Sequence, residues 1–424
     1  MFQDRYGNQI STTSATARDL YIEAVDRLLG AAPGLIDGFQ AVIDEDPNFA
    51  LAHSGLARCR IIMGDPVNAR AAMADARALA ESVSEQEASH LNAMGLLVDG
   101  KVPDGYRAVR RHVAEYPRDA VLAQTCTSVF GLIGFSGQPG REAELLAYTA
   151  GLMPHYGDDW WLTSQHAFSL CETGQLGPAA DLIEKSLAIN PRSGHGAHIR
   201  AHIHYEAGES ATGVSYLEGW LPDYGRSGLM HGHISWHTAL WKLEAGDIAR
   251  VWQLIDDNVA PDASKSPPLN VLTDNAAILY RLALAGVEVP RERWQEISDY
   301  AAKFFPNPGL GFADVHAALA YAMSGDTDAL NKIIANPAGP AADVVREASA
   351  AFGALAQHNW GEAQNHLIVA MGDHARLGGS RAQRDILEHA MLAALLKQGQ
   401  GAEAKRLLAL RRPVQADSHP VAGL

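Results

Sequence analysis

The sequence has few cysteines and no run of basic residues. Its three cysteines, Cys59, Cys126 and Cys171, are odd in number and far apart. We therefore expect reduced, buried thiols rather than a disulfide framework or a thiolate metal site. The chain carries 49 acidic against 34 basic residues, a formal net charge of -15. Because it contains no lysine- or arginine-rich segment, this charge disfavours a nucleic-acid partner.

Long apolar segments are also missing. No window approaches about 18 consecutive apolar residues, so we expect neither a membrane span nor a membrane partner. The first residues, "MFQDRYGNQISTTS", have neither the basic nor the apolar region of a secretory signal. Together with the unpaired cysteines, these features predict a cytoplasmic protein.

The alternation of apolar and polar residues that is typical of strands is missing as well. Beyond Thr13, Ala, Leu, Glu and Arg recur at helical spacing, and Gly or Pro interrupts the helices at a near-constant interval. Segments such as "HAFSLCETGQLGPAADLIEKSLAINP" and "AHIRAHIHYEAGESATGVSYLEGW" follow one plan: a helix, a glycine turn and a second amphipathic helix. This plan is that of the roughly 34-residue tetratricopeptide repeat.

The turn residues set the register of the repeats. We expect the repeats to centre on Gly64, Gly100, Gly174, Gly208, Gly246, Gly286, Gly325, Asn359 and Gly399, with a degenerate one around Gly137. The sequence thus predicts an all-α protein, a right-handed α-solenoid (an α-α superhelix) of about ten irregular tetratricopeptide-like helix pairs. Residues 1–413 would form this single domain, and residues 414–424 a loose C-terminal tail.

Several stretches go beyond the generic repeat. "LAINPRSGHGAHIRAHIHYEAG", "SWHTALWKLEAGDIARVWQLID", "FADVHAALAYAMSG" and "RLGGSRAQRDILEHAML" resemble the tetratricopeptide repeat protein 38 family, and the resemblance covers most of the chain. The residues that match the family's recurrent polar positions are His198, His202, His204, His233, His237, Asp274, Tyr280, Arg281, Asp314, His316, Gln383, Arg384 and Asp385. The resemblance implies an α-solenoid but brings no assigned reaction.

Histidines are concentrated in one part of the chain. Seven of the 18 fall within residues 195–237, where even scatter would give about two. If Gly208 ends the first helix of its repeat, the concave positions of that helix hold His195, His198, His202 and Tyr205. His204 falls on the opposite, packed side.

The next repeat repeats the pattern with His233 and His237, one turn apart on the concave face. We expect the two rows of histidines to face each other across a pocket. Histidines at i and i+4 suit a divalent metal such as zinc, with His198, His202, His233 and His237 as ligands.

A neutral imidazole beside a carboxylate is instead suited to acid–base catalysis without a metal. Asp274 or Asp314 would orient such a histidine, and Asp314 or His316 would complete a metal site. The alternative for each single histidine is a structural role at a helix interface.

Other residues are candidates for ligand contacts. Trp161 and Trp236 would form walls of the pocket, although aromatic residues at helical spacing are as often part of the core. Tyr280 occupies a concave position of its repeat. Arg384 follows a predicted capping box of Ser380 and Gln383, where it would bind an anion or, as the alternative, pair with an acidic neighbour.

Two functions remain open. The first is a hydrolase- or lyase-type enzyme that binds a small molecule in a histidine- and tryptophan-lined pocket. Its catalytic residues would be His198, His202, His233, His237, Asp314 and His316. Its ligand-binding residues would be His195, Tyr205, Trp161, Trp236, Asp274, Tyr280 and Arg384. The second is a scaffold whose groove binds a peptide or partner protein. The predicted groove offers imidazoles and tryptophans in place of the lysine, arginine and asparagine of peptide grooves, which favours the enzyme. A homo-oligomer is compatible with both.

Overall fold

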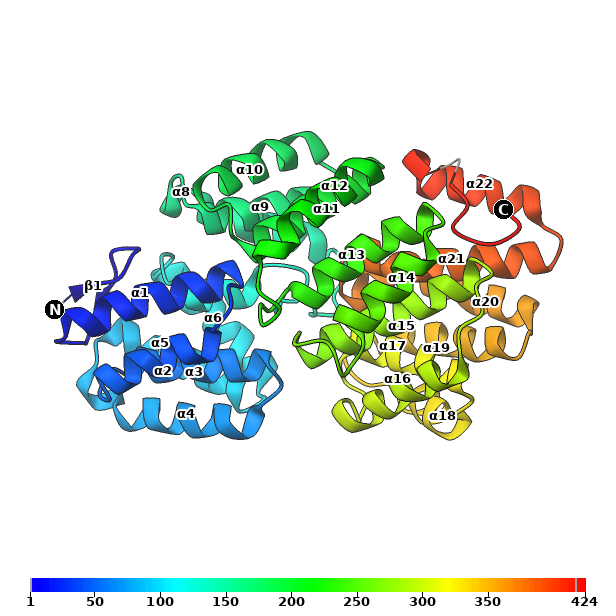
Figure 1. The fold of residues 1–424 in the computed structure, drawn as a ribbon. Coiled ribbons are helices and arrows are strands. Elements are labelled where there is room, and N and C mark those ends of the chain that lie inside the picture. Colours follow the sequence, from blue (N-terminus) through cyan, green and yellow to red (C-terminus); the bar gives the residue numbers. More distant parts are fainter. Residues whose placement is uncertain (1, 416–417) are drawn as a thin grey trace.

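Helices stack side by side along a curved path in the computed structural model, which describes residues 2–415 and 418–424 (Figure 1). Helices of the first half are α1 (Ala15–Gly30), α2 (Leu35–Glu45), α3 (Ala50–Ile62), α4 (Pro66–Ala78), α5 (Glu85–Val98), α6 (Val102–Glu115), α7 (Ala120–Ala123), α8 (Arg141–Tyr156), α9 (Trp160–Glu172), α10 (Leu176–Ile189) and α11 (Gly194–Ala207). Most pack as antiparallel pairs such as α3–α4 and α9–α10. The α-solenoid predicted from the sequence is confirmed.

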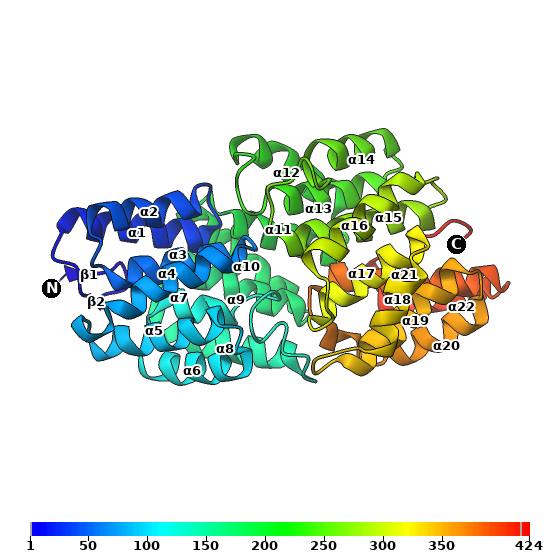
Figure 2. The same cartoon turned by 90° about the horizontal axis from the view of Figure 1, so that it is seen from below.

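The second half continues this arrangement, with α11 to α14 connecting the N-terminal helices to the C-terminal ones (Figure 2). Its helices are α12 (Ser210–Trp220), α13 (His231–Glu244), α14 (Ile248–Leu254), α15 (Pro268–Leu284), α16 (Arg291–Phe304), α17 (Gly311–Ser324), α18 (Thr327–Ala335), α19 (Ala342–Ala356), α20 (Trp360–Met371), α21 (Arg381–Lys397) and α22 (Gly401–Arg411). None of the helices in the described ranges is long and apolar enough to cross a membrane.

The turns within the helix pairs explain the repeat register. Gly64 and Gly208 have φ values of 75° and 73°, in the left-handed region where glycine meets no steric penalty. The turn expected at Asn359 is shifted by one residue, because His358 takes the left-handed position there with φ 61°. The sequence-based repeat count missed the pair α1–α2, since Ala31, not a glycine, adopts φ 53° at its turn.

A small hairpin precedes the solenoid. Strands β1 (Phe2–Gln3) and β2 (Gln9–Ile10) pair antiparallel, with Phe2 opposite Ile10. Strands of two residues are too short to show an alternation of apolar and polar residues, so they could not be predicted from the sequence.

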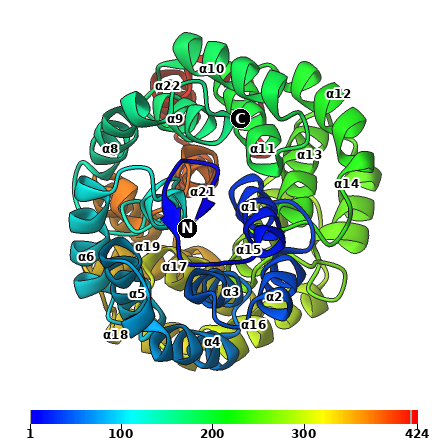
Figure 3. The same ribbon diagram turned by 90° about the vertical axis from the view of Figure 1, so that its left-hand side faces the viewer.

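The superhelix brings distant parts of the chain together. Seen end-on, α9, α11, α15, α17 and α21 lie on the inside of the ring, and α10, α12, α14 and α16 on the outside (Figure 3). Helix α21 contacts both α11 and α15, and α1 contacts α11. Polar contacts join these parts: Arg412 lies 3.2 Å from the Glu206 carboxylate, and Arg141 donates to Gly379 O at 2.8 Å.

The degenerate repeat expected around Gly137 is a loop instead of a helix pair. Helix α7 ends after one turn, and residues 127–140 cross to the C-terminal half before α8 begins. Phe130 and Phe135 pack on Phe312, with ring centroids 5.5 Å and 6.0 Å away, and Arg376 Nε donates to Gly137 O at 3.0 Å. We call residues 127–140 the crossing loop.

The chain end lies against α15. Val421 is buried, and the amide of Ala422 donates to Leu284 O at 2.8 Å. Of the tail 414–424, expected to be loose, residues 416–417 lie outside the described ranges. All three cysteines are free and buried.

Candidate metal and ligand site

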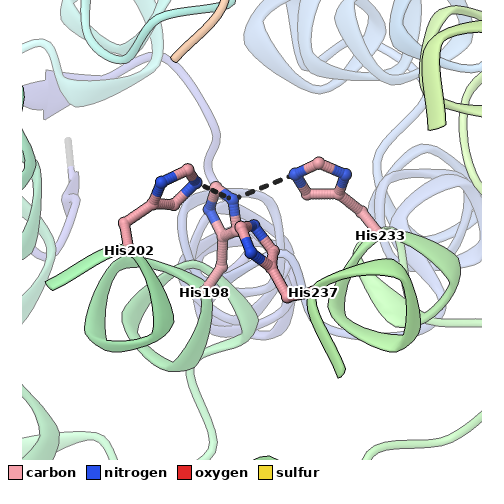
Figure 4. Close-up of side chains that lie close together, drawn as sticks. All are labelled: His198, His202, His233 and His237. Carbon is pink, nitrogen blue, oxygen red and sulfur yellow. Dashed lines mark hydrogen bonds between the residues drawn. The ribbon is translucent and has the colours of Figure 1, made fainter. Parts of the chain in front are cut away.

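Four histidines from two neighbouring inner helices meet at one point (Figure 4). Helix α11 supplies His198 and His202, and α13 supplies His233 and His237. Nε2 of His198 lies 2.8 Å from Nε2 of His202 and 3.1 Å from Nε2 of His233. One ring nitrogen from each of the four residues lies within 4.8 Å of the others. We call this group the histidine tetrad.

Local sequence signals place these side chains. Ser193 caps the N-terminus of α11 by accepting from the Gly196 amide at 3.0 Å, and Gly208 ends the helix. On α13, a Cβ at Gly232 would come within 2.7 Å of Ser264 Oγ, so only glycine lets the helix approach that closely. The i, i+4 spacing on each helix then aims both imidazoles in one direction.

Burial keeps three rings of the tetrad uncharged. His202 and His237 are 0% exposed, and His198 and His233 are 6% and 2% exposed. Desolvation, reinforced by neighbouring imidazoles, lowers the pKa of His198, His202 and His237 well below the usual value for histidine. These three rings are therefore neutral at physiological pH and present unprotonated nitrogens.

Asp274 on α15 orients one member of the tetrad. Its carboxylate oxygens lie 2.9 Å and 2.8 Å from Nδ1 of His233, both residues being almost fully buried. A carboxylate only accepts, so Nδ1 of His233 carries the proton and Nε2 turns a lone pair toward the other histidines. Trp236 stacks on the His233 ring with centroids 5.2 Å apart.

Hydrogen bonds within the protein do not satisfy the tetrad. If Nε2 of His198 carries a proton, the ring nitrogens of His202 and His233 both compete to accept it. If Nε2 carries no proton, its lone pair faces the lone pair of His233. Nδ1 of His202 and both ring nitrogens of His237 are buried and find no partner among the residues that the structure describes. Buried polar atoms are nearly always paired, so unpaired nitrogens from two residues in one cluster point to a missing partner.

A divalent transition-metal ion fits this donor set. Imidazole nitrogens bind such ions at about 2.0–2.1 Å, which puts the nitrogens of a tetrahedral site about 3.3 Å apart. Two of the observed separations, 2.8 Å and 3.1 Å, are close to that value, and all four nitrogens lie within 4.8 Å of one another. The Asp274–His233 pair provides the carboxylate–histidine arrangement that commonly supports a metal ligand.

A cavity of about 330 Å³ lies beside the tetrad, and His195, His198 and His233 form part of its wall. The expectation that two rows of histidines face each other across a pocket needs correction. The rings of His202 and His237 are in direct contact, with centroids 4.5 Å apart, so the side chains themselves fill the space between the two helices. The space is therefore next to the tetrad and not within it.

Four expected ligand contacts lie elsewhere. Trp161 packs in the core against Tyr156, and Trp236 lies behind His233, so neither belongs to the cavity wall. Tyr205 donates to Asp385 at 2.7 Å near the C-terminal end of α11, outside the cavity wall. Tyr280 packs on Phe352, with ring centroids 5.7 Å apart.

The remaining candidates are occupied by local contacts. Asp314 accepts from the Gly309 amide at 2.9 Å, and His316 Nδ1 bonds Phe312 O at 2.7 Å; neither lies in the tetrad or the cavity wall. Arg384 pairs with Glu142, as the alternative interpretation expected, and the capping box at the start of α21 is confirmed. His204 lies outside the tetrad and pairs with Glu209 at 2.7 Å.

A second buried group contains His90, His112 and Asp119. Asp119 Oδ2 lies 2.7 Å from His90 Nδ1 and 3.0 Å from His112 Nε2. The remaining ring nitrogens are also paired, His90 with Ser54 at 3.0 Å and His112 with Ser89 at 2.9 Å. The two histidines hold the pKa of Asp119 well below its usual range. We call His90, His112 and Asp119 the paired triad.

Sequence reasoning missed most of the cavity wall. The crossing loop contributes Phe130 and Phe135, and more distant segments contribute Arg58, Gln124 and Asn270. One signal was present: the repeat pattern breaks down in "TCTSVFGLIGFSGQPG", and a long non-repetitive loop in a compact protein is often functional.

The paired inner and outer helices define the class of protein as a tetratricopeptide-like α-solenoid. No model of a known protein family matches the chain.

Solved structures with a similar course of the chain include the human IFIT1 dimer with m7Gppp-AAAA. It has a TM-score of 0.44 and 12% identity over 96% of this chain and 98% of that one. Another is yeast Tom70, with a TM-score of 0.37 and 13% identity over 94% of this chain and 85% of that one.

Proposed function

We propose that the protein is a small-molecule enzyme of the hydrolase or lyase type, whose histidine tetrad holds a divalent transition-metal ion such as zinc at the end of the cavity. The observation that carries the proposal is the unpaired state of the tetrad, with buried nitrogens of His202 and His237 lacking partners. A structural histidine cluster would satisfy these atoms, as the paired triad does.

The position of the cavity supports a catalytic metal over a purely structural one. His198 and His233 belong both to the tetrad and to the cavity wall, so an ion between the four rings would have one side toward the cavity. A metal in that place acts as a Lewis acid on a bound carbonyl or lowers the pKa of a water molecule. His195, whose pKa burial lowers to about 4, remains a neutral base on the same wall.

The size of the cavity supports a small molecule as the ligand. A volume of about 330 Å³ is at the lower end of the range for ligand pockets, and the lining is mainly apolar with a few polar groups. A peptide groove would be longer and more open. We likewise propose, on the motifs described above, that the chain is related to the tetratricopeptide repeat protein 38 family.

The metal content of the purified protein tests this function. We expect close to one equivalent of a transition metal in the wild type, and less than a tenth of that in His198→Ala and in His237→Ala, because each removes one ligand. His204→Ala, on the same helix but outside the tetrad, is the matched control and should retain the metal. If the tetrad variants bind as much zinc as the control after reconstitution, the proposed function is wrong.

A further inference from the structure

The polar groups of the cavity wall define which ligands it accepts. The lining contains no aspartate or glutamate, although the whole chain has a net charge of -15. It does contain one arginine, Arg58 on α3. The charge of the cavity lining is therefore opposite in sign to the net charge of the whole protein.

Arg58 is not neutralised by the protein. Within the described ranges, no carboxylate lies at salt-bridge distance from its guanidinium group, and its hydrogen-bond partner is the neutral Gln124, whose Oε1 lies 3.3 Å from Nε and 3.0 Å from Nη2. Burial lowers the pKa of Arg58, and no neighbouring carboxylate opposes that effect. The guanidinium group is held in place by its Nε–Nη2 edge, while Nη1 and the second N–H of Nη2 have no hydrogen-bond partner among the described residues.

Gln124 and Gln383 on the same wall also offer donors. Gln383 is 2% exposed, and its Oε1 accepts from Ser380 in the capping box of α21. Its Nε2 is buried with no partner. The acceptor oxygens of Gln124 and Gln383 are thus both used within the protein, and donors are left for a ligand.

Most of the remaining wall is apolar; its other polar members are the histidines together with Thr127, Ser128, Gln165 and Asn270. Phe130 and Phe135 of the crossing loop and Phe168 of α9 form aromatic surfaces, and Phe168 also packs on the rings of His198 and His202 at 5.7 Å and 4.9 Å. The apolar wall therefore reaches the tetrad. A ligand lying along it would have one end near the histidines.

We infer that the cavity binds a small amphipathic carboxylate, whose anionic group pairs with Arg58 and whose apolar body lies against the phenylalanines. Arginine suits this task because its planar group makes two parallel bonds to a carboxylate. The inference rests on the proposed function in that the ligand would be its substrate, and it adds the chemical class of that substrate.

Binding of two matched probes tests the inference. The probes are 3-phenylpropanoate and 3-phenylpropan-1-ol, which share the apolar body and differ in charge; affinities are measured by calorimetry on the protein as purified and after chelator treatment. We expect the wild type to bind the carboxylate at least about tenfold tighter than the alcohol in both forms, since the preference comes from Arg58 and not from the metal.

Variants separate Arg58 from other sources of preference. Arg58→Gln should abolish the preference while leaving binding of the alcohol and the metal content unchanged, and Arg58→Lys should retain part of it. Arg107→Gln, an exposed arginine paired with Asp104, is the control and should behave as the wild type.

Equal binding of both probes to the wild type, no binding of either, or a preference that survives Arg58→Gln would overturn the inference. Failure of the proposed function has a different signature: metal content that does not depend on the tetrad, whatever the outcome with the probes.

Discussion

Two groups of buried histidines, the paired triad of α5–α7 and the tetrad of α11 and α13, differ in how their nitrogens are used. In the paired triad, Asp119 and two serines satisfy every ring nitrogen of His90 and His112. In the tetrad, nitrogens of His202 and His237 have no partner. Both groups have the residue types and spacing of a metal site. The two groups thus differ in unsatisfied hydrogen-bonding capacity and not in residue type.

The largest effect is expected from breaking the paired triad. Asp119→Ala removes the acceptor shared by both histidines and also the N-cap of α7, leaving buried nitrogens unpaired. We expect the free energy of unfolding to fall by about 3–5 kcal/mol, measured by urea denaturation, with the metal content of the folded protein unchanged. Asp104→Ala, at an exposed site, should change it by less than about 0.5 kcal/mol. If Asp119→Ala changes the free energy of unfolding only slightly, the paired triad does not stabilise the fold and the difference between the two groups is wrong.

The second expected effect is stabilisation of the metal-free protein by zinc. At a free concentration of about 100 times Kd, a ligand that binds only the folded state stabilises it by about 2.7 kcal/mol. We expect this increase in the wild type and in His112→Asn, which alters the paired triad, but not in His198→Ala. Thermal unfolding with and without zinc measures it. Loss of the increase in His112→Asn alone would place the metal in the triad.

A smaller effect is expected at Asp274, which contacts the tetrad through His233. Asp274→Ala removes the group that sets the tautomer and orientation of that ring, so the zinc affinity should fall about 10- to 100-fold. Asp274→Asn keeps an acceptor oxygen, so its zinc affinity should fall less than that of Asp274→Ala. Competition with a chelating dye measures both values. Equal affinity in all three proteins would show that Asp274 does not support a metal ligand.

The smallest effect concerns the pH dependence of stability in the metal-free protein. The unfolded chain takes up a proton on His202 as the pH falls through about 6.5, whereas in the folded state burial lowers the pKa of His202 well below that value. The stability contributed by the neutral ring is thus complete above about pH 6.5 and is lost as the pH falls below it.

Each such histidine adds a slope of about 1.4 kcal/mol per pH unit. His202→Leu should reduce the slope between about pH 6 and about pH 5 by that amount, measured by urea denaturation at several pH values. The low pKa of Asp119 acts only at much lower pH, so this carboxylate does not contribute to the difference. An unchanged slope would mean that His202 already carries a proton in the folded protein.

The fold could be predicted because its signals are local. Glycines at left-handed turns such as Gly174 and Gly325, with φ 79° and 87°, recur at the repeat period and mark each helix pair. Where another residue takes that conformation, as Ala31 and His358 do, the register was missed or shifted by one position. The same rule also predicted one helix pair that does not exist, because Gly137 has a left-handed φ of 67° but lies in a loop.

The tetrad could be predicted for the same reason, since i, i+4 pairs on adjacent inner helices must point the same way. The cavity could not. Arg58, Phe130 and Gln383 are brought together by the curvature of the superhelix and by a loop that follows no repeat. Asp274 and Asp314 were equal candidates for orienting a histidine; α15 packs beside α13, whereas Asp314 bonds its own Gly309 amide.

The crossing loop also restricts how the number of repeats can change. An array in which each unit contacts only its neighbours can gain or lose a unit at local cost. Here Phe130 and Phe135 pack on Phe312, and Gly137 O accepts from Arg376, so units far apart in the array are in direct contact. A unit inserted or deleted between α9 and α17 would change the rotation between these partners and separate them. Duplication of a repeat within this segment would therefore separate the residues that form the cavity wall.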